Sequence, residues 1–177
     1  MTVWFISDTH FCHAPIINYA SRPFRTIDEM NETLIGNWNS VVKNCDTVYV
    51  LGDFGECRDR TKLVDIFEKL NGRKCLIVGN NDKTNVLKLP WDMIRNYYEI
   101  RYKGRMFVLS HYPIKYMCWN KSYRGSMHLH GHLHSTVPYD EDKPLRIDVS
   151  CDGWSYFPVN IETVAKIGKQ SLKSKSC

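Results

Sequence analysis

The sequence contains four short apolar runs, and each is followed by one small residue and then by a side chain with an oxygen or nitrogen donor. The donors are Asp8, Asp53, Asn80 and His111. Runs of this length and composition predict buried β-strands. Because ligands bind beyond the carboxyl ends of the strands in open α/β sheets, we expect the four donors to meet in one crevice.

Two further motifs add imidazoles to this set. Asp8-Thr9-His10 places a carboxylate and an imidazole two residues apart, and residues 130–134 read HGHLH, with a histidine at every second position. If these segments are extended, alternate side chains project to the same side. Gly131 allows the backbone to approach a ligand closely.

The combined set has too many donors for one tetrahedral ion. It comprises seven side chains: Asp8, His10, Asp53, Asn80, His111, His132 and His134. Such a set suits two divalent ions about 3.5–4 Å apart that share a carboxylate. Imidazole together with carboxylate and amide ligands favours Mn, Fe, Zn, Ni or Co over Mg or Ca. The sequence therefore predicts a two-metal site.

The remaining pattern predicts a mixed α/β chain. Its first half alternates strands with helices, and Thr26 and Glu29 fit a capping box. Its second half is mostly strand, with a hairpin around Lys103-Gly104. We expect strands at 3–6, 47–51, 75–78, 94–102, 105–110, 127–130, 145–149 and 159–161, and helices at 14–20, 27–42, 62–70, 83–89 and 162–167. This order favours two packed sheets flanked by helices.

Length and composition indicate one domain. The 177 residues show no internal repeat and no linker, so we expect a domain over residues 1–168 and a flexible, basic tail over 169–177. The seven cysteines are odd in number and show no C-x-x-C spacing, which favours reduced thiols in the cytoplasm. No apolar run approaches the roughly 20 residues that span a bilayer, so no membrane partner is expected. The net charge of +5 mildly favours an anionic substrate.

The order of the donor motifs resembles that of the calcineurin-like metallophosphoesterases. The motifs read D-x-H at residues 8–10, GD at 52–53, GN at 79–80, a single His111, and GHxH at 131–134. They span most of the chain, and its compact length is similar to that of the small bacterial and phage-type members. The resemblance implies a four-layer α/β/β/α sandwich of two mixed sheets flanked by helices.

The resemblance also implies a division of the ligands between two ions. One ion would be held by Asp8, His10, Asp53 and His134, and the other by Asp53, Asn80, His111 and His132. Asp53 would then bridge the two ions, for which Mn²⁺ is the first candidate. A hydroxide held by the ions would attack phosphorus in line. The implied activity is hydrolysis of phosphodiester or phosphomonoester bonds, with a small nucleotide-like diester slightly preferred as substrate.

One motif departs from the family pattern. Residues 79–82 read GNND, whereas the family usually has GNHD, so Asn81 replaces a candidate proton donor. An amide does not titrate usefully, although Asn81 could still hydrogen-bond a phosphate oxygen. Either the preferred leaving groups need little protonation, or another residue supplies the proton, and His13 is the first candidate. The candidate catalytic residues are thus Asn81, Asp82 and His13.

Two other functions stay open at this point. The chain could be a DNA or RNA nuclease of the same superfamily, although no appended DNA-capping domain is present. Alternatively, it could be a metal-stabilised binding module that has lost hydrolysis together with the usual histidine at position 81. The oligomeric state is left open.

Other polar and aromatic residues receive a structural interpretation. Residues 22–24 are interpreted as a surface turn rather than a substrate-contacting loop, and residues 152–154 as a turn. His128 and His130 are expected to pack or hydrogen-bond rather than bind metal. The aromatic group after His111 is expected to cover the core, with base stacking as the alternative; it comprises Tyr112, Tyr116, Trp119 and Tyr123.

Overall fold

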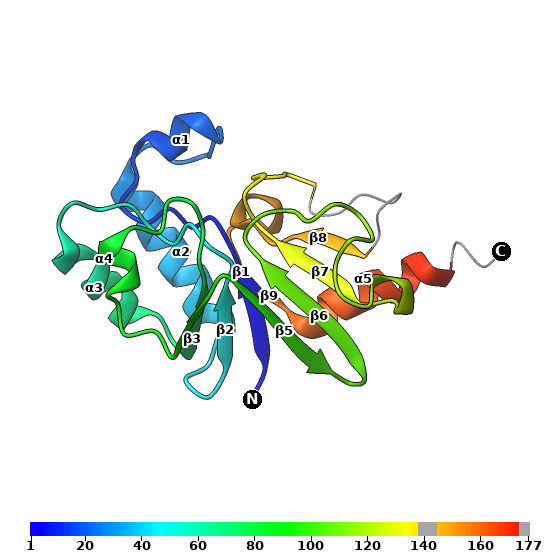
Figure 1. Ribbon diagram of the computed structural model, residues 1–177. Helices are drawn as coiled ribbons and strands as arrows, with labels where there is room; N and C mark the ends of the chain where they lie inside the picture. Colours follow the sequence, from blue (N-terminus) through cyan, green and yellow to red (C-terminus); the bar gives the residue numbers. More distant parts are fainter. Residues whose placement is uncertain (138–144, 174–177) are drawn as a thin grey trace.

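Two mixed β-sheets pack face to face, with helices on their outer faces (Figure 1). The computed structural model describes residues 1–137 and 145–173, the last five by backbone alone. Each sheet buries one face against the other sheet and one against helices, as layered domains require. The predicted sandwich of two mixed sheets with flanking helices is confirmed.

The first sheet carries the strands that precede three of the predicted donors. Its order is β4 (Met93–Arg95), β3 (Arg73–Ile77), β2 (Thr47–Val50), β1 (Val3–Ile6) and β9 (Val159–Asn160). Strands β1 to β4 are parallel to their neighbours, and β9 pairs antiparallel with β1. The carboxyl ends of β1, β2 and β3 therefore lie at one edge of the sheet.

Four helices lie on the outer side of this sheet. They are α1 (Pro15–Tyr19), α2 (Ile27–Val41), α3 (Arg60–Lys69) and α4 (Thr84–Leu87). At the start of α2, Thr26 Oγ1 accepts a hydrogen bond from Glu29 N, but Glu29 accepts one from Arg25 N, so the predicted capping box is only half formed. The apolar side of α2 faces the sheet, and its buried residues are Met30, Leu34 and Trp38.

The second sheet joins a hairpin to two parallel strands. Its order is β5 (Tyr97–Tyr102), β6 (Arg105–Ser110), β7 (Met127–His130) and β8 (Arg146–Asp148). Strands β5 and β6 form the predicted hairpin, whose turn residues Lys103 and Gly104 have φ values of 47° and 79°. Strands β6, β7 and β8 are parallel. Helix α5 (Ile161–Lys173) packs beside this sheet, where Arg105 donates to the Ala165 carbonyl.

Two apolar clusters form the core. One lies between the first sheet and helices α1 to α4 and includes Ile6, Trp38 and Phe54. The other includes Phe5 and Phe107 between the two sheets and extends to Ile161 and Val164 of α5. The neighbours Phe5 and Ile6 enter different clusters because successive side chains of a strand point to opposite faces.

Two elements differ from the prediction by more than one or two residues at an end. Residues 94–102 do not form one strand, because β4 belongs to the first sheet and β5 to the second, with Asn96 between them. The hydrophobic pattern continues through this point and cannot show a change of sheet. The closing helix begins at Ile161 and continues to Lys173, beyond the predicted end at residue 167.

The structure describes only part of the predicted C-terminal tail. Residues 169–173, assigned to the predicted tail, continue α5, and residues 174–177 lie outside the described residues, so the flexible tail stays a prediction. None of the helices in the described ranges combines the length and the apolar character needed to cross a membrane.

Candidate metal centre

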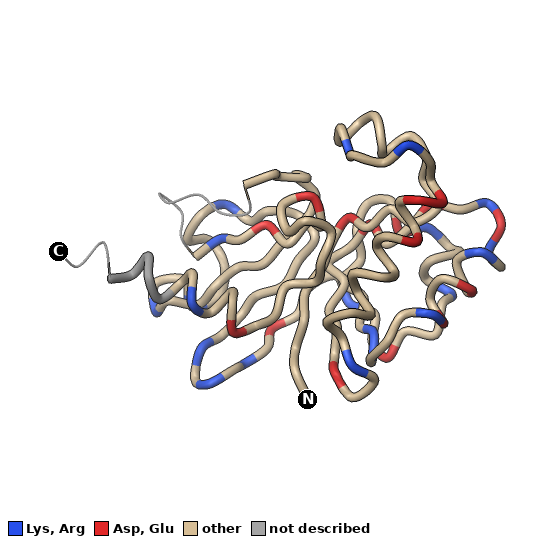
Figure 2. The backbone as a smooth tube through the Cα atoms, turned by 180° about the vertical axis from the view of Figure 1, so that it is seen from behind, with Lys and Arg blue, Asp and Glu red and all other residues tan. Residues whose placement is uncertain are grey.

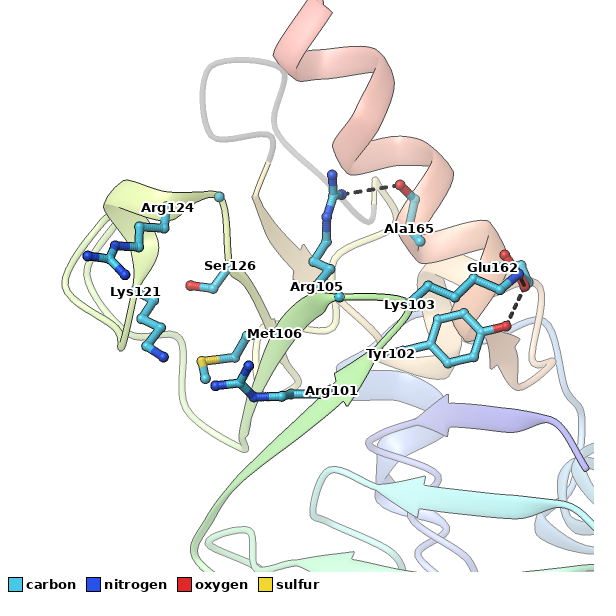
Figure 3. Close-up of a pocket in the computed structure, with 12 residues that line it drawn as sticks. Arg101, Tyr102, Lys103, Arg105, Met106, Lys121, Arg124, Ser126, Glu162 and Ala165 are labelled. Carbon is cyan, nitrogen blue, oxygen red and sulfur yellow. Dashed lines mark hydrogen bonds and ion pairs between the residues drawn. The ribbon is translucent and has the colours of Figure 1, made fainter.

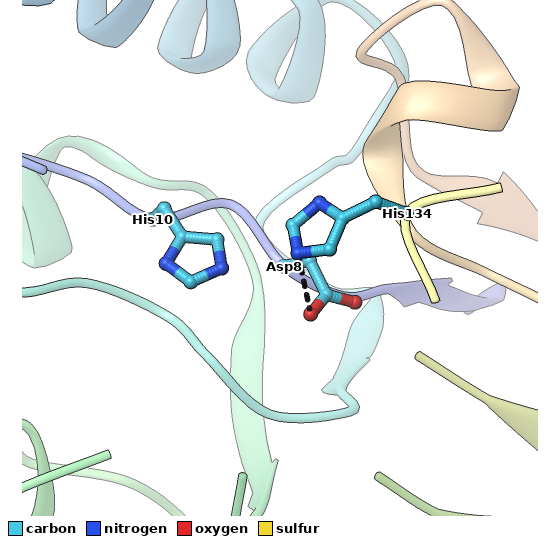
Figure 4. A group of neighbouring side chains, drawn as sticks. All are labelled: Asp8, His10 and His134. Atoms are coloured by element: carbon cyan, nitrogen blue, oxygen red, sulfur yellow. Dashed lines mark ion pairs between the residues drawn. The ribbon is translucent and has the colours of Figure 1, made fainter. Parts of the chain in front are cut away.

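The predicted donors gather where the edges of the two sheets meet. They follow β1, β2 and β3 in the first sheet and β6 and β7 in the second. Ligand atoms of Asp8, His10 and His134 lie within 4.8 Å of one another, and so do those of Asp8, Asp53 and His111. In Figure 4, His10 and Asp8 come from the loop after β1 and face His134 from the loop after β7. Donors that are far apart in the chain therefore form one cluster.

The backbone at five of the seven donors is left-handed rather than extended. The φ values are 58° at Asp8, 48° at His10, 54° at Asp53, 73° at His132 and 50° at His134. The extended conformation assumed for residues 8–10 and 130–134 is therefore wrong beyond the ends of β1 and β7. Left-handed non-glycine residues cost roughly 1–2 kcal/mol each, and such strain clusters at functional sites. Tight turns, and not strand alternation, aim these side chains inward.

Two glycines allow the loops to approach this closely. A Cβ atom at Gly131 would lie 1.9 Å from Ser7 Oγ and 2.4 Å from Asp8 Oδ2. A Cβ atom at Gly79 would lie 2.3 Å from Asp53 Oδ1. The GN and GHxH motifs need glycine because the carboxylates occupy the space of a side chain.

Histidine nitrogens face carboxylate oxygens across short gaps. His10 Nε2 lies 3.6 Å from Asp53 Oδ2, and His111 Nε2 lies 3.7 Å from Asp53 Oδ1. His134 Nε2 lies 3.6 Å from Asp8 Oδ1. These gaps are longer than hydrogen bonds. They are close to the roughly 3–3.5 Å that separates two ligand atoms on one ion when each metal bond is about 2.1 Å.

Two buried atoms of the cluster have no hydrogen-bond partner in the described structure. They are Asp8 Oδ1 and His10 Nε2. The other oxygen of Asp8 accepts from His132 N and lies 2.9 Å from Ser150 Oγ. Unpaired buried polar atoms are rare and costly, so each calls for a partner such as an ion.

The protonation states favour metal binding over ion pairing. Burial lowers the pKa of His10 to about 2, so this imidazole is neutral and carries a free lone pair at neutral pH. Burial also raises the pKa of Asp8, because nothing in its surroundings fully compensates the desolvated charge. A divalent cation between the two would compensate both groups. The residues present therefore fit a metal ion.

Asn80 connects two further histidines on the open side of the cluster. Its Oδ1 atom lies 2.9 Å from His111 Nε2 and 3.0 Å from His132 Nδ1. His111 Nδ1 donates to the Leu51 carbonyl at 2.8 Å, so a neutral His111 presents an Nε2 lone pair to the Asn80 oxygen. Two acceptors that face each other at this distance suit a shared cation. Asn80 and His132 are exposed, whereas Asp53 and His111 are buried.

Asp152 and Arg22 form a buried ion pair behind His134. The Asp152 carboxylate accepts from His134 Nδ1 at 2.9 Å and from Arg22 Nε at 2.8 Å. Arg22 also donates to the backbone carbonyls of Asp8 and Thr9. Although burial alone would lower the pKa of His134, the hydrogen bond to Asp152 and the charge of Asp8 raise it. Because His134 donates through Nδ1, its Nε2 atom is left to bind metal.

This ion pair corrects two interpretations from the sequence. Arg22 was expected in a surface turn, but its side chain is fully buried. Residues 152–154 were expected to form a turn, but they belong to a short 3₁₀-helix, η2 (Cys151–Trp154). The sequence signal for Asp152 was weak, because it lies four residues after the end of β8 and that strand contains Arg146 and Asp148. No local pattern marks Arg22.

The three candidate catalytic residues lie around Asp53 and His10. Asn81 donates from N to Asp53 Oδ1 at 2.8 Å and from Nδ2 to Asp53 Oδ2 at 2.7 Å. Asp82 accepts from the backbone N–H groups of Asp53 and of two neighbouring loop residues, and burial raises its pKa. His13 lies 3.6 Å from Glu56 and 3.5 Å from His10. Asn81 and Asp82 thus hold Asp53 in place, while partly exposed His13 lies beside the cluster.

The interpretations of the remaining histidines and of Trp119 are confirmed, whereas the one for Tyr112 is wrong. His128 accepts from Ile114 N and donates to the Val108 carbonyl, and His130 donates to the Gly131 carbonyl, so the expected structural role of both is confirmed. Trp119 is buried in the core as expected. Tyr112 is 52% exposed, and its ring packs edge-on against His111 and His132, so it borders the metal centre instead of covering the core.

The chain is similar to proteins from an archaeon, a phage and a bacterium. An uncharacterized protein of Methanocaldococcus jannaschii is 37% identical over 170 residues, covering 93% of this chain and 90% of that protein. The Gene 66 protein of Mycobacterium phage D29 is 28% identical over 180 residues, covering 86% and 88%. A solved structure from Aquifex aeolicus, of unknown function, has a TM-score of 0.75 at 29% identity and covers 94% of this chain and 98% of that one.

A more distant structure shares the fold. An archaeal phosphodiesterase has a TM-score of 0.51 at 22% identity and covers 87% of each chain. Residues 1–149 match the profile of the calcineurin-like phosphoesterase superfamily domain. That range contains all seven predicted ligands and most of both sheets. The chain belongs to the calcineurin-like phosphoesterase superfamily.

Proposed function

We propose that this protein is a cytoplasmic, dinuclear-metal phosphoesterase that hydrolyses phosphodiester or phosphomonoester bonds, with a small nucleotide-like diester preferred. The pair of buried, unpartnered ligand atoms, Asp8 Oδ1 and His10 Nε2, carries this proposal. Buried ligand atoms without a partner, on a backbone with positive φ, lower the stability of the fold unless a cation binds there.

The donors divide around Asp53 in a way that supports two sites. Asp53 Oδ2 faces His10 and Asp53 Oδ1 faces His111, so one carboxylate borders both halves of the cluster. Asp8, His10 and His134 would hold one ion with Asp53, and Asn80, His111 and His132 would hold the other with Asp53. The mixed imidazole, carboxylate and amide set favours Mn²⁺ or a similar ion. Such ions, when bound, lower the pKa of water and polarise phosphoryl oxygens.

Asn81 serves Asp53 rather than the leaving group in this arrangement. Both of its donor groups are used by the Asp53 carboxylate, which fixes the orientation of the bridging ligand. Proton delivery is then left to His13, which lies on the accessible side next to Glu56, or is not needed for leaving groups of low pKa.

Tyr112 supports the preference for a nucleotide-like substrate. Its exposed ring stands beside His132, on the side where Asn80 opens the cluster to solvent. An aromatic face at that position can stack on a base while the phosphoryl group reaches the ligands.

Hydrolysis of two chromogenic esters tests the proposal. Chelated protein is resupplied with Mn²⁺ and assayed on bis-p-nitrophenyl phosphate and on p-nitrophenyl phosphate. We expect metal-dependent turnover, faster on the diester. Asp53→Asn should abolish it, because this change removes charge between the two sites.

A control variant that loses the same charge elsewhere tests whether the loss of turnover in Asp53→Asn is specific to the metal centre. Asp92 forms an exposed ion pair with Arg73, so Asp92→Asn should keep full turnover. Cleavage of plasmid or oligonucleotide DNA at a higher rate than the small diester would support the nuclease alternative. Two bound metal ions without turnover on any phosphoester would instead support a binding module and sink the proposal.

A further inference from the structure

A basic pocket lies beside the β5–β6 hairpin. Its volume is about 520 Å³, and its walls come from the hairpin, from the segment around the 3₁₀-helix η1 (Ser122–Arg124) and from α5 (Figure 3). Five cationic side chains line it against one carboxylate, Glu162; the cations are Arg101, Lys103, Arg105, Lys121 and Arg124. Figure 2 shows Lys and Arg gathered in the same hairpin.

This pocket is separate from the metal centre. Strand β6 begins at Arg105 in the pocket wall and ends at Ser110, directly before the predicted ligand His111. Six residues of extended chain span about 20 Å. A small molecule bound at the metal centre therefore does not reach the pocket.

The one carboxylate of the pocket already has cationic and hydroxyl partners. Glu162 accepts from Lys103 Nζ and from the Tyr102 hydroxyl. Across the described ranges, Arg101, Lys121 and Arg124 make no ion pair within 4.0 Å of a carboxylate, although the charges of Lys121 and Arg101 help to lower the pKa of Glu99 beside the pocket. The pocket thus presents excess positive charge.

Arg105 is partly buried without an anionic partner among the described residues. Its Nη1 atom donates to the Ala165 carbonyl at 3.3 Å and lies 3.5 Å from Met127 Sδ. Burial lowers the pKa of Arg105, and no neighbouring carboxylate raises it. A desolvated guanidinium without a counter-charge gains when an anion enters the cavity.

The segment that carries Lys121 and Arg124 is fixed to the second sheet. Trp119 is buried, and its Nε1 atom donates to Ser126. Asn120 Nδ2 donates to both carboxylate oxygens of Glu99 on β5. The backbone segments that carry the cations on the two sides of the pocket are therefore fixed relative to each other before a ligand binds, which lowers the entropy cost of binding.

We propose that this pocket binds a small ligand with a chain of two or three phosphate groups. Arginine forks match phosphate oxygens in a bidentate manner, and cations on two walls suit consecutive phosphates better than a single one. The cavity volume lies within the range of small-molecule sites. Inorganic oligophosphate and the phosphate chain of a nucleotide share this chemistry. The site is independent of the proposed phosphoesterase activity.

Calorimetric titration with tripolyphosphate and with ATP tests the pocket. The full-length, Mn²⁺-loaded protein is compared with a triple variant, Arg101→Gln, Lys121→Gln and Arg124→Gln. We expect the dissociation constant to rise about tenfold or more, because several charge-assisted hydrogen bonds are lost. Equal affinity for the two ligands assigns the site to the phosphate chain alone, and tighter binding of ATP assigns it to a nucleotide; either result supports the pocket.

Two control variants separate binding in the pocket from binding elsewhere on the protein. A second triple variant, Lys69→Gln, Lys88→Gln and Arg95→Gln, removes the same charge from exposed positions near the first sheet and should leave binding unchanged. Asp53→Asn should remove any binding at the metal centre and keep the binding component that the pocket variant loses, so binding that is lost in Asp53→Asn but kept in the pocket variant would place the ligand at the metal centre. Pocket-dependent binding of a single-stranded oligonucleotide, with no binding of tripolyphosphate or ATP, would also overturn the proposal.

Discussion

Asp152 holds the imidazole of His134 in the tautomer that presents Nε2 to the metal centre. We expect Asp152→Asn to weaken metal affinity about 10–100-fold, because second-sphere carboxylates of this kind orient their histidine and raise its basicity. Competition between the protein and a fluorescent chelator measures the affinity. The exposed Asp92→Asn variant should bind metal like the wild type, and an unchanged affinity in Asp152→Asn would remove this role.

The leaving-group proton distinguishes the roles of His13 and Asn81. If His13 supplies it, His13→Ala should slow hydrolysis of alkyl esters by about 10²-fold or more, while p-nitrophenyl esters, with a leaving group of low pKa, should change little. If no residue supplies it, Asn81→His should speed alkyl monoester hydrolysis. Rates on the two ester classes distinguish these cases, and alkyl turnover that neither variant changes contradicts both ideas.

The predicted metal ligands that follow an apolar run could be found from the sequence. The residues that hold these ligands in place through hydrogen bonds and ion pairs could not. Asp8, Asp53, Asn80 and His111 could be placed because strand ends of parallel sheets meet at one edge. Arg22 acts through contacts with Asp152, which lies 130 positions away in the chain. Two residues so far apart produce no recognisable spacing motif in the sequence. The positive φ values at the ligands produce no such motif either.

At the scale of the loops between elements, Gly131 controls how closely the two sheets approach. A methyl group there would overlap Ser7 Oγ and Asp8 Oδ2, so we expect Gly131→Ala to lower stability by about 1–3 kcal/mol and to lose bound metal. Exposed Gly36 in α2 has open space around it, and Gly36→Ala should instead raise stability by about 0.5–1 kcal/mol. Urea denaturation and metal analysis of both variants check the contrast.

Asp46 links the start of β1 to the start of β2. It accepts from Thr2 N at 2.6 Å, Lys43 N at 3.0 Å and Trp4 Nε1 at 3.2 Å. Burial would raise the pKa of Asp46, but these hydrogen bonds outweigh burial and lower it. Because the folded pKa is depressed, the stabilising effect is complete above the unfolded pKa of about 3.9 and is lost as the pH falls through the folded value.

We therefore expect Asp46→Asn to lower the free energy of unfolding by about 1 kcal/mol at pH 7. The difference from the wild type should shrink as the pH falls below about 4. Urea denaturation at several pH values measures both numbers. A difference that is constant from pH 7 to pH 3 would show that the charge of Asp46 has no part in it.

Most elements were predictable, because their apolar residues follow the period of a helix or a strand. The break at Asn96 was not, since β4 and β5 are both strands and only their pairing partners differ. Strand pairing depends on residues distant in the chain, and the local pattern does not record it.

For the whole molecule, the metal ions and the fold should stabilise each other. Binding to the folded state alone raises stability by about 2.7 kcal/mol when free metal is 100 times its dissociation constant. Chelation should therefore lower the thermal midpoint of the wild type and of Asp92→Asn, and should have less effect on Asp53→Asn. Scanning calorimetry with and without chelator measures the shift, and equal midpoints would mean that no ion binds the folded state selectively.

The position of β9 has a consequence for how the protein is made. Asn160 pairs with Trp4, so one edge of the first strand stays uncovered until the last strand of the described chain has been synthesised. At about 5–20 residues per second, a ribosome needs on the order of 8–30 s to supply that partner. During this interval β1 presents an open edge to other nascent chains. Slow synthesis should therefore favour aggregation of this protein, and a chaperone that shields the edge should raise its yield.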